Sequence, residues 1–353
     1  GSSSAASVGD DFPRLSAWPF APWTAFFVRG DFAVGYRNVS QGWSCLLEAP
    51  QVKESWASCG RSVFPESWVR SLGGAVDDIL SDPTNQDREE YTRPGGAGRF
   101  AGEMDCSRKY PEFERFVLES PAAEIAARVM SCSRVAFFYD FLFVKEPGTE
   151  DRTPWHQDLG YWSVQGSEIC SVWMPLEDLP KEASMEFVVR GRMPSALRGR
   201  DLAPLRFATG QVYEGAEDMP RVPDVQSDRE QWQVTSWDTK VGDCIVFRAD
   251  VLHAAAANQT LGRRRALSTR WLGPDARFVV GSKCAETRRS GYPNFRVGLQ
   301  DGQQVVDSGC QAFPILWPLE ARGRLRSPGA LVPFPGYGAE RQAQGQLYSR
   351  DHV

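Results

Sequence analysis

Histidine is the most informative residue type in this chain, because only three histidines occur among 353 residues. One of them, His352, stands next to the C-terminus, which leaves His156 and His253, and Asp158 follows His156 two residues later. Alternate residues of a β-strand point to the same side, so His156 and Asp158 can hold one ion together while His253 completes the set. Two histidines and one carboxylate on one face of a metal leave other positions open, an arrangement typical of non-haem Fe(II) oxygenases.

Strand-forming segments surround these residues and must position them. The segment Arg134–Lys145 is rich in aromatic and β-branched residues and ends at a Glu-Pro-Gly turn signal. Further strand patterns occupy 168–176, 184–190, 237–251 and 264–272, and the pattern over 237–251 has a turn at Gly242-Asp243. Upstream, apolar residues at spacings of three and four predict helices over 65–81 and 111–131, the second broken at Pro121. Helices followed by many short strands, without a parallel βαβ rhythm, predict a mainly β fold with flanking helices, of the jelly-roll type.

Changes in amino-acid composition along the chain indicate its domain organisation. Residues 1–10 read as a disordered leader or a cloning remnant, and 11–60 as an aromatic-rich N-terminal extension that packs on the core or, alternatively, closes over the pocket. We expect the catalytic domain over 61–320 and a C-terminal tail over 321–353. Within the domain, the polar segment 192–233 is long enough to be a substrate lid.

Charge and cysteine usage limit the partners and the compartment. The chain has 40 basic and 45 acidic residues, and this balance gives no reason to expect binding to nucleic acid or to an anionic membrane. No apolar run approaches the ~20 residues that span a bilayer. A small-molecule substrate is therefore the expected partner, while the oligomeric state stays open. The eight cysteines are dispersed without a CxxC pair, which favours free thiols in a reducing, cytoplasmic compartment.

Several sequence blocks, taken in order, resemble one enzyme family. They are Phe143–Gly148, Thr153–Asp158 followed by Tyr161 and Trp162, Ser171–Leu176, and His253 followed by Asn258 and Arg264. These blocks are similar to those of the phytanoyl-CoA dioxygenase (PhyH) family, and the resemblance covers roughly 65–320. It implies a double-stranded β-helix, the cupin-like variant of the jelly roll, together with Fe(II), the cosubstrate 2-oxoglutarate and O2.

The resemblance also implies roles for individual residues. His156, Asp158 and His253 match the iron ligands, and Arg264 matches the arginine that pairs with the distal carboxylate of 2-oxoglutarate. A guanidinium offers a planar, bidentate partner for such a carboxylate. Strand alternation predicts that the side chains of the neighbouring residues at 263 and 265 turn to the opposite face. Trp173 matches a tryptophan near the cosubstrate.

Five further positions are weaker candidates, each with a structural alternative. Lys145 either assists the cosubstrate or is an exposed residue at a strand end. Asp140 interrupts an apolar strand and either orients a ligand histidine or lies at an edge. Tyr161, Trp162 and Gln157 either line the substrate pocket or belong to the core.

The family often has a hydroxyl side chain two residues after the second histidine, where this chain has Ala255. A different hydroxyl must then help to hold the cosubstrate carboxylate. Thr153 is the first candidate, and Ser171 and Ser268 are the alternatives.

The implied reaction is hydroxylation, or a related oxidation, of an unactivated C–H bond in a small organic substrate such as a natural product or acyl compound. Succinate and CO2 are released. The presence of Asp158 favours this outcome over halogenation, because halogenating relatives lack that carboxylate. Two alternatives use the same fold: a hydrolase with Zn2+ on the same ligands, and a non-catalytic module that binds or stores a metal or ligand.

Overall fold

The computed structural model describes residues 57–85, 87–188, 193–197, 201–213, 215–279 and 298–319, with Gly329 and Leu331. It also describes the backbone of three strands before residue 57: β1 (Trp23–Phe27), β2 (Ala33–Asn38) and β3 (Trp43–Glu48). The predicted leader at 1–10 lies outside the described residues, as does nearly all of the predicted tail at 321–353.

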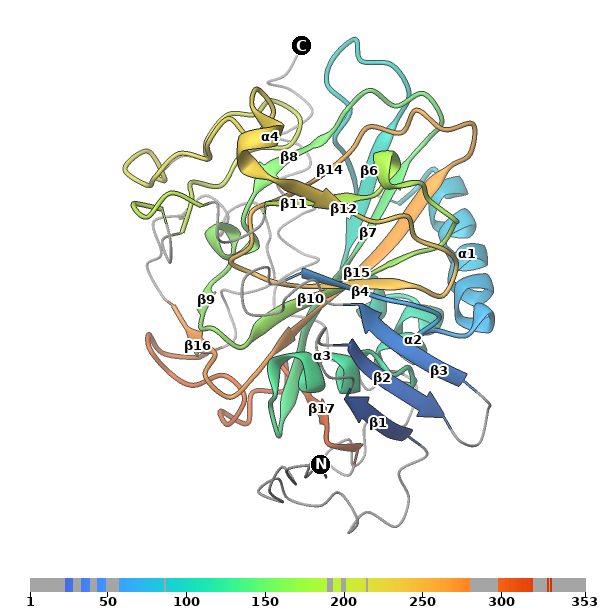
Figure 1. The fold of residues 1–353 in the computed structure, drawn as a ribbon, viewed down its shortest axis with the longest axis vertical. Helices are drawn as coiled ribbons and strands as arrows, with labels where there is room; N and C mark the ends of the chain where they lie inside the picture. The colour runs from blue at the N-terminus through green and yellow to red at the C-terminus, as the bar shows by residue number, and fades with distance from the viewer. Residues whose placement is uncertain are drawn as a thin grey trace, which may run out of the picture.

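Two antiparallel sheets form the body of the protein (Figure 1). The large sheet has the strand order β1-β2-β3-β4-β13-β10-β15-β7-β6-β5, with β17 also paired to β7. Its remaining strands are β4 (Ala57–Gly60), β5 (Arg88–Glu90), β6 (Phe100–Met104), β7 (Val135–Lys145), β10 (Ile169–Pro175), β13 (Cys244–Arg248), β15 (Arg264–Leu272) and β17 (Ile315–Trp317). The small sheet contains β12 (Val234–Ser236), β11 (Met185–Val188), β14 (His253–Ala255) and β8 (Thr153–His156) in that order. A separate pair joins β9 (Val164–Gln165) to β16 (Arg277–Phe278).

Three helices pack on the large sheet: α1 (Glu66–Ser81), α2 (Pro111–Glu119) and α3 (Ala122–Met130). The short α4 (Arg229–Trp232) lies beside the small sheet, where Trp232 packs against Val188 and Ala254. The 3-10 helices are η2 (Cys106–Arg108), η3 (Asp158–Tyr161) and η4 (Lys181–Ala183). Both predicted helices are confirmed, and the break occurs at Pro121, which caps the N-terminus of α3. None of the helices in the described part of the chain has the length and apolar character needed to cross a bilayer.

Strand alternation divides the core into two layers. Val172 and Met174 of β10 belong to a cluster with Leu72 of α1 and Phe116 of α2, so this layer fills the space between sheet and helices. Trp173, between them in sequence, instead joins a cluster with residues of the small sheet, including Met185 and Phe187. Burying each large apolar side chain contributes ~1.5–3 kcal/mol, so both layers are major sources of stability. The space between the two sheets is where the candidate ligands lie.

A bulge in β7 decides which of its side chains enter that space. Thr269 of β15 is paired with Asp140, whereas Trp271 is paired with Phe137, so β7 has one more residue than β15 over this stretch. An extra residue reverses the alternation of the strand beyond it. Phe137 therefore packs on the helix side, while Phe141 faces the small sheet and Asp140 is directed away from it.

Most predicted strands are confirmed with small shifts at their ends. The strand pattern over 237–251 was predicted with a turn at Gly242-Asp243, and this turn is present, while the strand β13 itself is limited to Cys244–Arg248. A turn precedes it, with Gly242 at a φ of 92° and the Asp243 carboxylate accepting hydrogen bonds from the backbone N–H groups of Ser62 and Lys240. The segment after 304 docks on the core, since Phe313 and Leu316 are buried and β17 pairs with β7.

Candidate metal centre and cavity

His156, Asp158 and His253 converge on one point. His253 of β14 stands directly opposite His156 of β8 in the small sheet. The Asp158 Oδ1 atom lies 3.7 Å from His156 Nε2 and 3.8 Å from His253 Nε2, and one potential ligand atom from each residue lies within 4.8 Å of the others. Asp158 begins η3 rather than continuing the strand, but Gln157 before it is extended, with φ −111° and ψ 139°. The spacing of two residues therefore still places His156 and Asp158 on the same side.

Backbone carbonyls orient both imidazole rings. His156 Nδ1 lies 2.7 Å from the Pro154 carbonyl oxygen, and His253 Nδ1 lies 2.8 Å from that of Val251. A proton on each Nδ1 satisfies these carbonyls and leaves both Nε2 lone pairs directed toward Asp158. Burial, together with the neighbouring His156, lowers the pKa of His253 to about 3, so this ring is neutral at pH 7. Neutral imidazole is the form that binds a metal.

The Asp158 carboxylate is held in its ionised form. Burial raises its pKa, but the neighbouring His156 and His253 and the cation Arg270 outweigh burial and keep the pKa of Asp158 below its ordinary range. The Ser171 hydroxyl donates to Oδ2 at 3.1 Å, which leaves Oδ1 toward the histidines. Two imidazole nitrogens and one carboxylate oxygen suit a divalent ion such as Fe(II), and also Zn2+.

A cavity opens beside the three residues, with about 640 Å³ of empty space including its mouth. Aromatic rings form most of its wall and come from β7, η3 and the residue after it, β10, β13 and the loop after Leu202: Tyr139, Phe141, Phe143, Tyr161, Trp162, Trp173, Phe207 and Phe247. The wall is therefore largely apolar, and its charged members are few.

Arg264 is one of those charged members. Its side chain lines the cavity, the residue is 3% exposed, and the guanidinium carbon lies 5.7 Å from the centre of the Trp173 ring. The Nε atom is buried without a hydrogen-bond partner. Burial lowers the pKa of Arg264 to about 10, so the group remains a cation at neutral pH. Because an unpaired buried cation is costly, this arrangement fits an anionic ligand such as a carboxylate.

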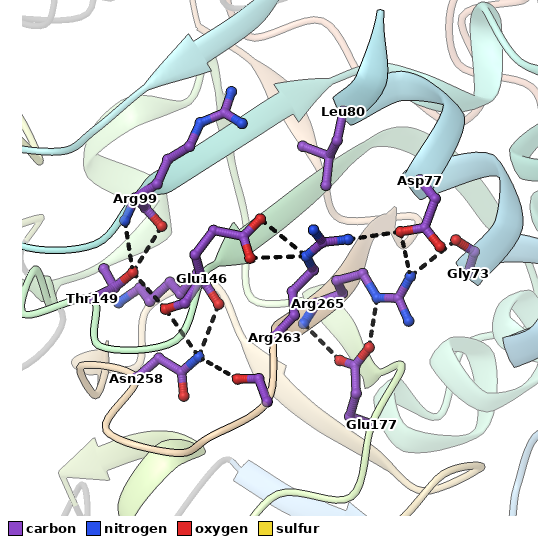
Figure 2. A network of polar contacts seen from close by, with 12 residues as sticks. Gly73, Asp77, Leu80, Arg99, Glu146, Thr149, Glu177, Asn258, Arg263 and Arg265 are labelled. Carbon is purple, nitrogen blue, oxygen red and sulfur yellow. Dashed lines mark hydrogen bonds and ion pairs between the residues drawn. The ribbon is translucent and has the colours of Figure 1, made fainter.

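The residue after Arg264 is fixed on the opposite face, where β15 meets α1 (Figure 2). The backbone N–H and Nε of Arg265 donate to the Glu177 carboxylate at 2.7 and 2.5 Å. One guanidinium nitrogen of Arg265 also donates to the Asp77 carboxylate and to the Gly73 carbonyl, each at 3.0 Å.

The residue before Arg264 is fixed in the same way. Arg263 donates to Asp77 at 2.8 Å and to Glu146 at 3.0 Å. Asn258 closes the preceding turn, and its amide donates to the carbonyls of Lys145 and Gly262. The prediction that both neighbours turn away is confirmed, and these contacts leave Arg264 as the inward-facing member of the triplet.

Of the weaker candidates, Thr153, Trp173, Tyr161 and Trp162 all line the cavity. The polar atoms of the last two are already paired. The Tyr161 hydroxyl donates to the Leu205 carbonyl at 2.8 Å and accepts from the Leu205 N–H at 2.9 Å, while Trp162 Nε1 donates to the Tyr139 hydroxyl at 2.6 Å. Tyr161 and Trp162 therefore offer ring surface to a ligand rather than free hydrogen-bonding groups.

Three candidates lie outside the cavity wall, and their polar atoms bond to other groups of the protein. Lys145 Nζ donates to the Ala256 carbonyl at 2.9 Å, and burial followed by the charge of Arg264 lowers its pKa well below the usual range. Gln157, extended between two ligands, points to the other side and bridges the Asp250 carbonyl and the Leu202 N–H.

Asp140 is the third candidate that lies outside the cavity wall. The β7 bulge turns it toward η2, where it accepts hydrogen bonds from the backbone and hydroxyl of Ser107 at 3.0 and 2.5 Å. It does not orient a ligand histidine, since carbonyls hold both rings.

Sequence reasoning missed Arg270, a second arginine in the cavity wall. The available signal was its even spacing from Arg264 along one strand, which places both side chains on the same face. It also missed Phe207, which belongs to a loop without a readable pattern.

The chain matches the family model for phytanoyl-CoA dioxygenase (PhyH) over residues 59–266. Among curated proteins it is 26% identical over 131 residues to a probable phytanoyl-CoA dioxygenase of Caenorhabditis elegans, covering 36% of this chain and 39% of that one. It is 25% identical over 130 residues to the peroxisomal phytanoyl-CoA dioxygenase of Mus musculus, covering 36% of each. The chain thus spans about two fifths of the length of the curated relatives it matches.

Solved structures agree with the fold. The non-haem α-ketoglutarate-dependent carbocyclase SnoK from nogalamycin biosynthesis superposes with a TM-score of 0.57 at 19% identity, covering 75% of this chain and 93% of SnoK. The epimerase SnoN, solved with Fe3+, α-ketoglutarate and nogalamycin RO, superposes with a TM-score of 0.54 at 18% identity, covering 75% of this chain and 96% of SnoN. Together with the two antiparallel sheets, these superpositions confirm the predicted jelly-roll core. Since the family model spans more than half of the residues, the chain belongs to the phytanoyl-CoA dioxygenase (PhyH) family.

Proposed function

We propose that the protein is an Fe(II)- and 2-oxoglutarate-dependent oxygenase that oxidises a C–H bond of a small organic substrate and releases succinate and CO2. The observation that carries the proposal is one cavity holding both a buried His-Asp-His set and the buried, incompletely bonded guanidinium of Arg264. Family membership supports it. A zinc hydrolase would use the same three ligands but would give Arg264 no partner.

The residues have distinct tasks in this proposal. His156, Asp158 and His253 hold Fe(II), and Arg264 binds the distal carboxylate of 2-oxoglutarate. Bound iron and cosubstrate supply the activation of O2, with the oxidative decarboxylation of 2-oxoglutarate as the source of electrons. The hydroxyls of Thr153 and Ser268 line the same cavity and can donate to the cosubstrate in place of the one missing at Ala255.

The aromatic part of the cavity wall determines which substrates can enter. Aromatic rings on several sides exclude water and favour an apolar or ring-containing substrate over a highly polar one. This agrees with an expected substrate among natural products or acyl compounds. The six cysteines in the described residues are free thiols, which supports our proposal of a reducing compartment.

Conversion of 2-oxoglutarate to succinate tests the proposal directly. We expect slow, Fe(II)-dependent succinate formation by the purified protein in air, and none after His253→Ala. Arg264→Gln should raise the half-saturating concentration of 2-oxoglutarate by about tenfold or more, since a charge-assisted, bidentate contact is lost. Arg263→Gln, which removes a neighbouring charge on the other face, is the control. Iron-loaded protein that neither binds nor consumes 2-oxoglutarate would refute the assignment.

A further inference from the structure

The cavity contains a second buried guanidinium that iron and 2-oxoglutarate do not use. Arg270 is 5% exposed, and its guanidinium carbon lies 4.7 Å from the ring centre of Tyr139 and 5.8 Å from that of Phe141. One of its terminal nitrogens donates to the Ser268 carbonyl at 2.6 Å, while Nε is buried without a partner. No ion pair with a described carboxylate involves this arginine. Arg270 is thus a cation with unused hydrogen-bonding capacity, enclosed in the wall of a ligand site.

Arg270 and Arg264 mark different parts of the cavity. Both face inward from β15, and six residues of extended strand place their backbones ~20 Å apart. Arg264 lies over Trp173, whereas Arg270 lies over Tyr139, and the Arg270 cation lowers the pKa of both Asp158 and His253. Arg270 is therefore on the side of the metal site where β7 provides the aromatic wall. This is the wall expected to contact the organic substrate.

The balance of charge also leaves a role for one more anion. Two guanidiniums, one carboxylate and a divalent ion give the cavity three net positive charges. The dianion 2-oxoglutarate neutralises two of them and leaves one. A substrate with a single negative charge completes the balance, and a guanidinium fork with a free Nε matches the two oxygens of a carboxylate.

We propose that Arg270 binds a carboxylate group of the organic substrate, so that the enzyme selects ring-containing or otherwise apolar carboxylic acids. This inference rests on the proposed function and deepens it by naming a substrate class. The rings of Tyr139 and Phe141, which lie beside Arg270 and line the cavity, would contact the apolar part of such a molecule.

A pair of isosteric probes tests the inference in protein loaded with 2-oxoglutarate and with Mn(II) in place of Fe(II), so that no turnover occurs. 2-Naphthoate and the neutral 2-naphthamide are titrated while the fluorescence of the cavity tryptophans, Trp162 and Trp173, is recorded. We expect the wild type to bind naphthoate about tenfold more tightly than naphthamide, since one charge-assisted contact distinguishes them. Arg270→Gln should abolish this preference, and Arg270→Lys should restore only part of it, because the planar fork is lost. Arg277→Gln, at an exposed position outside the cavity, should leave the preference unchanged.

A parallel calorimetric titration with 2-oxoglutarate separates the possible results. If Arg270→Gln binds 2-oxoglutarate within about twofold of wild type while losing the naphthoate preference, the inference holds. Equal binding of the two probes by wild type, absence of saturable naphthoate binding, or a preference that survives Arg270→Gln overturns it. So does a large loss of 2-oxoglutarate affinity in Arg270→Gln, which would assign Arg270 to the cosubstrate. Failure of the wild type to bind 2-oxoglutarate at all would instead refute the proposed function.

Discussion

At the scale of single residues, the three candidate ligands differ in how they are held. Each histidine depends on a backbone carbonyl two residues earlier, which no side-chain substitution removes. Asp158 instead depends on the hydroxyl of Ser171, supplied by a strand of the other sheet. The weakest point in the orientation of the metal centre is therefore the contact between Ser171 and Asp158.

Replacing Ser171 by alanine should weaken metal binding without unfolding the protein. Loss of a partner that orients a ligand typically lowers metal affinity ~10-fold or more. Ser184→Ala is a matched control, because Ser184 is equally buried but its hydroxyl has no hydrogen-bond partner. Mn(II) or Fe(II) affinity, measured by anaerobic calorimetry, should fall for Ser171→Ala and stay near wild type for Ser184→Ala. Equal affinities for the two variants would contradict this role.

Residue types and spacing were sufficient to predict that His156, Asp158 and His253 come together and that Arg264 lies near them, in the wall of the same cavity. Histidine is so rare in this chain that the pair His156 and His253 stands out, and the even spacing to Asp158 survives even though a 3-10 helix begins there. Asp140 could not be placed, because its direction depends on a bulge that only the pairing of β7 with β15 reveals. Lys145 and Gln157 are close in sequence to the candidate ligands, but their side chains form hydrogen bonds with backbone groups and do not line the cavity.

At the scale of elements, β15 determines the chemistry of the cavity. One face of this strand supplies Arg264, Ser268 and Arg270 to the cavity, and the other packs on the helices or is tied to α1. The ion-paired side of the strand is thus connected to the ligand side through the backbone itself. Loosening the contacts around Arg265 should disturb Arg264, because the two residues are adjacent on β15 and the Glu177 carboxylate that binds Arg265 also attracts the Arg264 cation.

Glu177→Ala tests this coupling. It removes the acceptor for both the backbone N–H and the Nε of Arg265. Because Glu177 is partly exposed, we expect a modest loss of about 1 kcal/mol in the free energy of unfolding. The half-saturating concentration of 2-oxoglutarate should rise several-fold with little change in metal affinity. Glu182→Ala, at an exposed site with a 4.0 Å contact to Lys181, is the control and should change neither quantity. Unchanged 2-oxoglutarate binding in Glu177→Ala would show that Arg264 is positioned independently.

At the scale of the whole molecule, two sheets and a helical layer enclose two separate apolar layers. The fold class was predictable because strand alternation and helical periodicity are both clear in the sequence. The position of the loop that contributes Phe207 was not predictable, because it depends on contacts such as that between Tyr161 and Leu205 rather than on a repeating pattern.

The buried thiols give the whole fold a dependence on pH. Burial, and then the neighbouring Cys132, raises the pKa of Cys170 well above its usual range. Above pH ~8.5 the unfolded chain releases this proton while the folded protein keeps it, so the free energy of unfolding falls as pH rises, by at most about 1.4 kcal/mol per pH unit. Urea unfolding at pH 8, 9 and 10 should show a shallower decline for Cys170→Ala than for wild type. If the free energy of unfolding declined with pH equally in Cys170→Ala and in wild type, Cys170 would not contribute to the pH dependence.

The most direct test of the account is an anaerobic titration with Fe(II) and 2-oxoglutarate, monitored through the weak visible charge-transfer band of the chelate. We predict a saturable band in the wild type and no band in His156→Ala. In Arg264→Gln the band should appear only at 2-oxoglutarate concentrations about tenfold higher than in the wild type, or higher still. Arg263→Gln should behave like wild type, because its side chain lies on the opposite face. Absence of the band in iron-loaded wild type, or an Arg264→Gln titration that overlays the wild-type curve, would contradict the account.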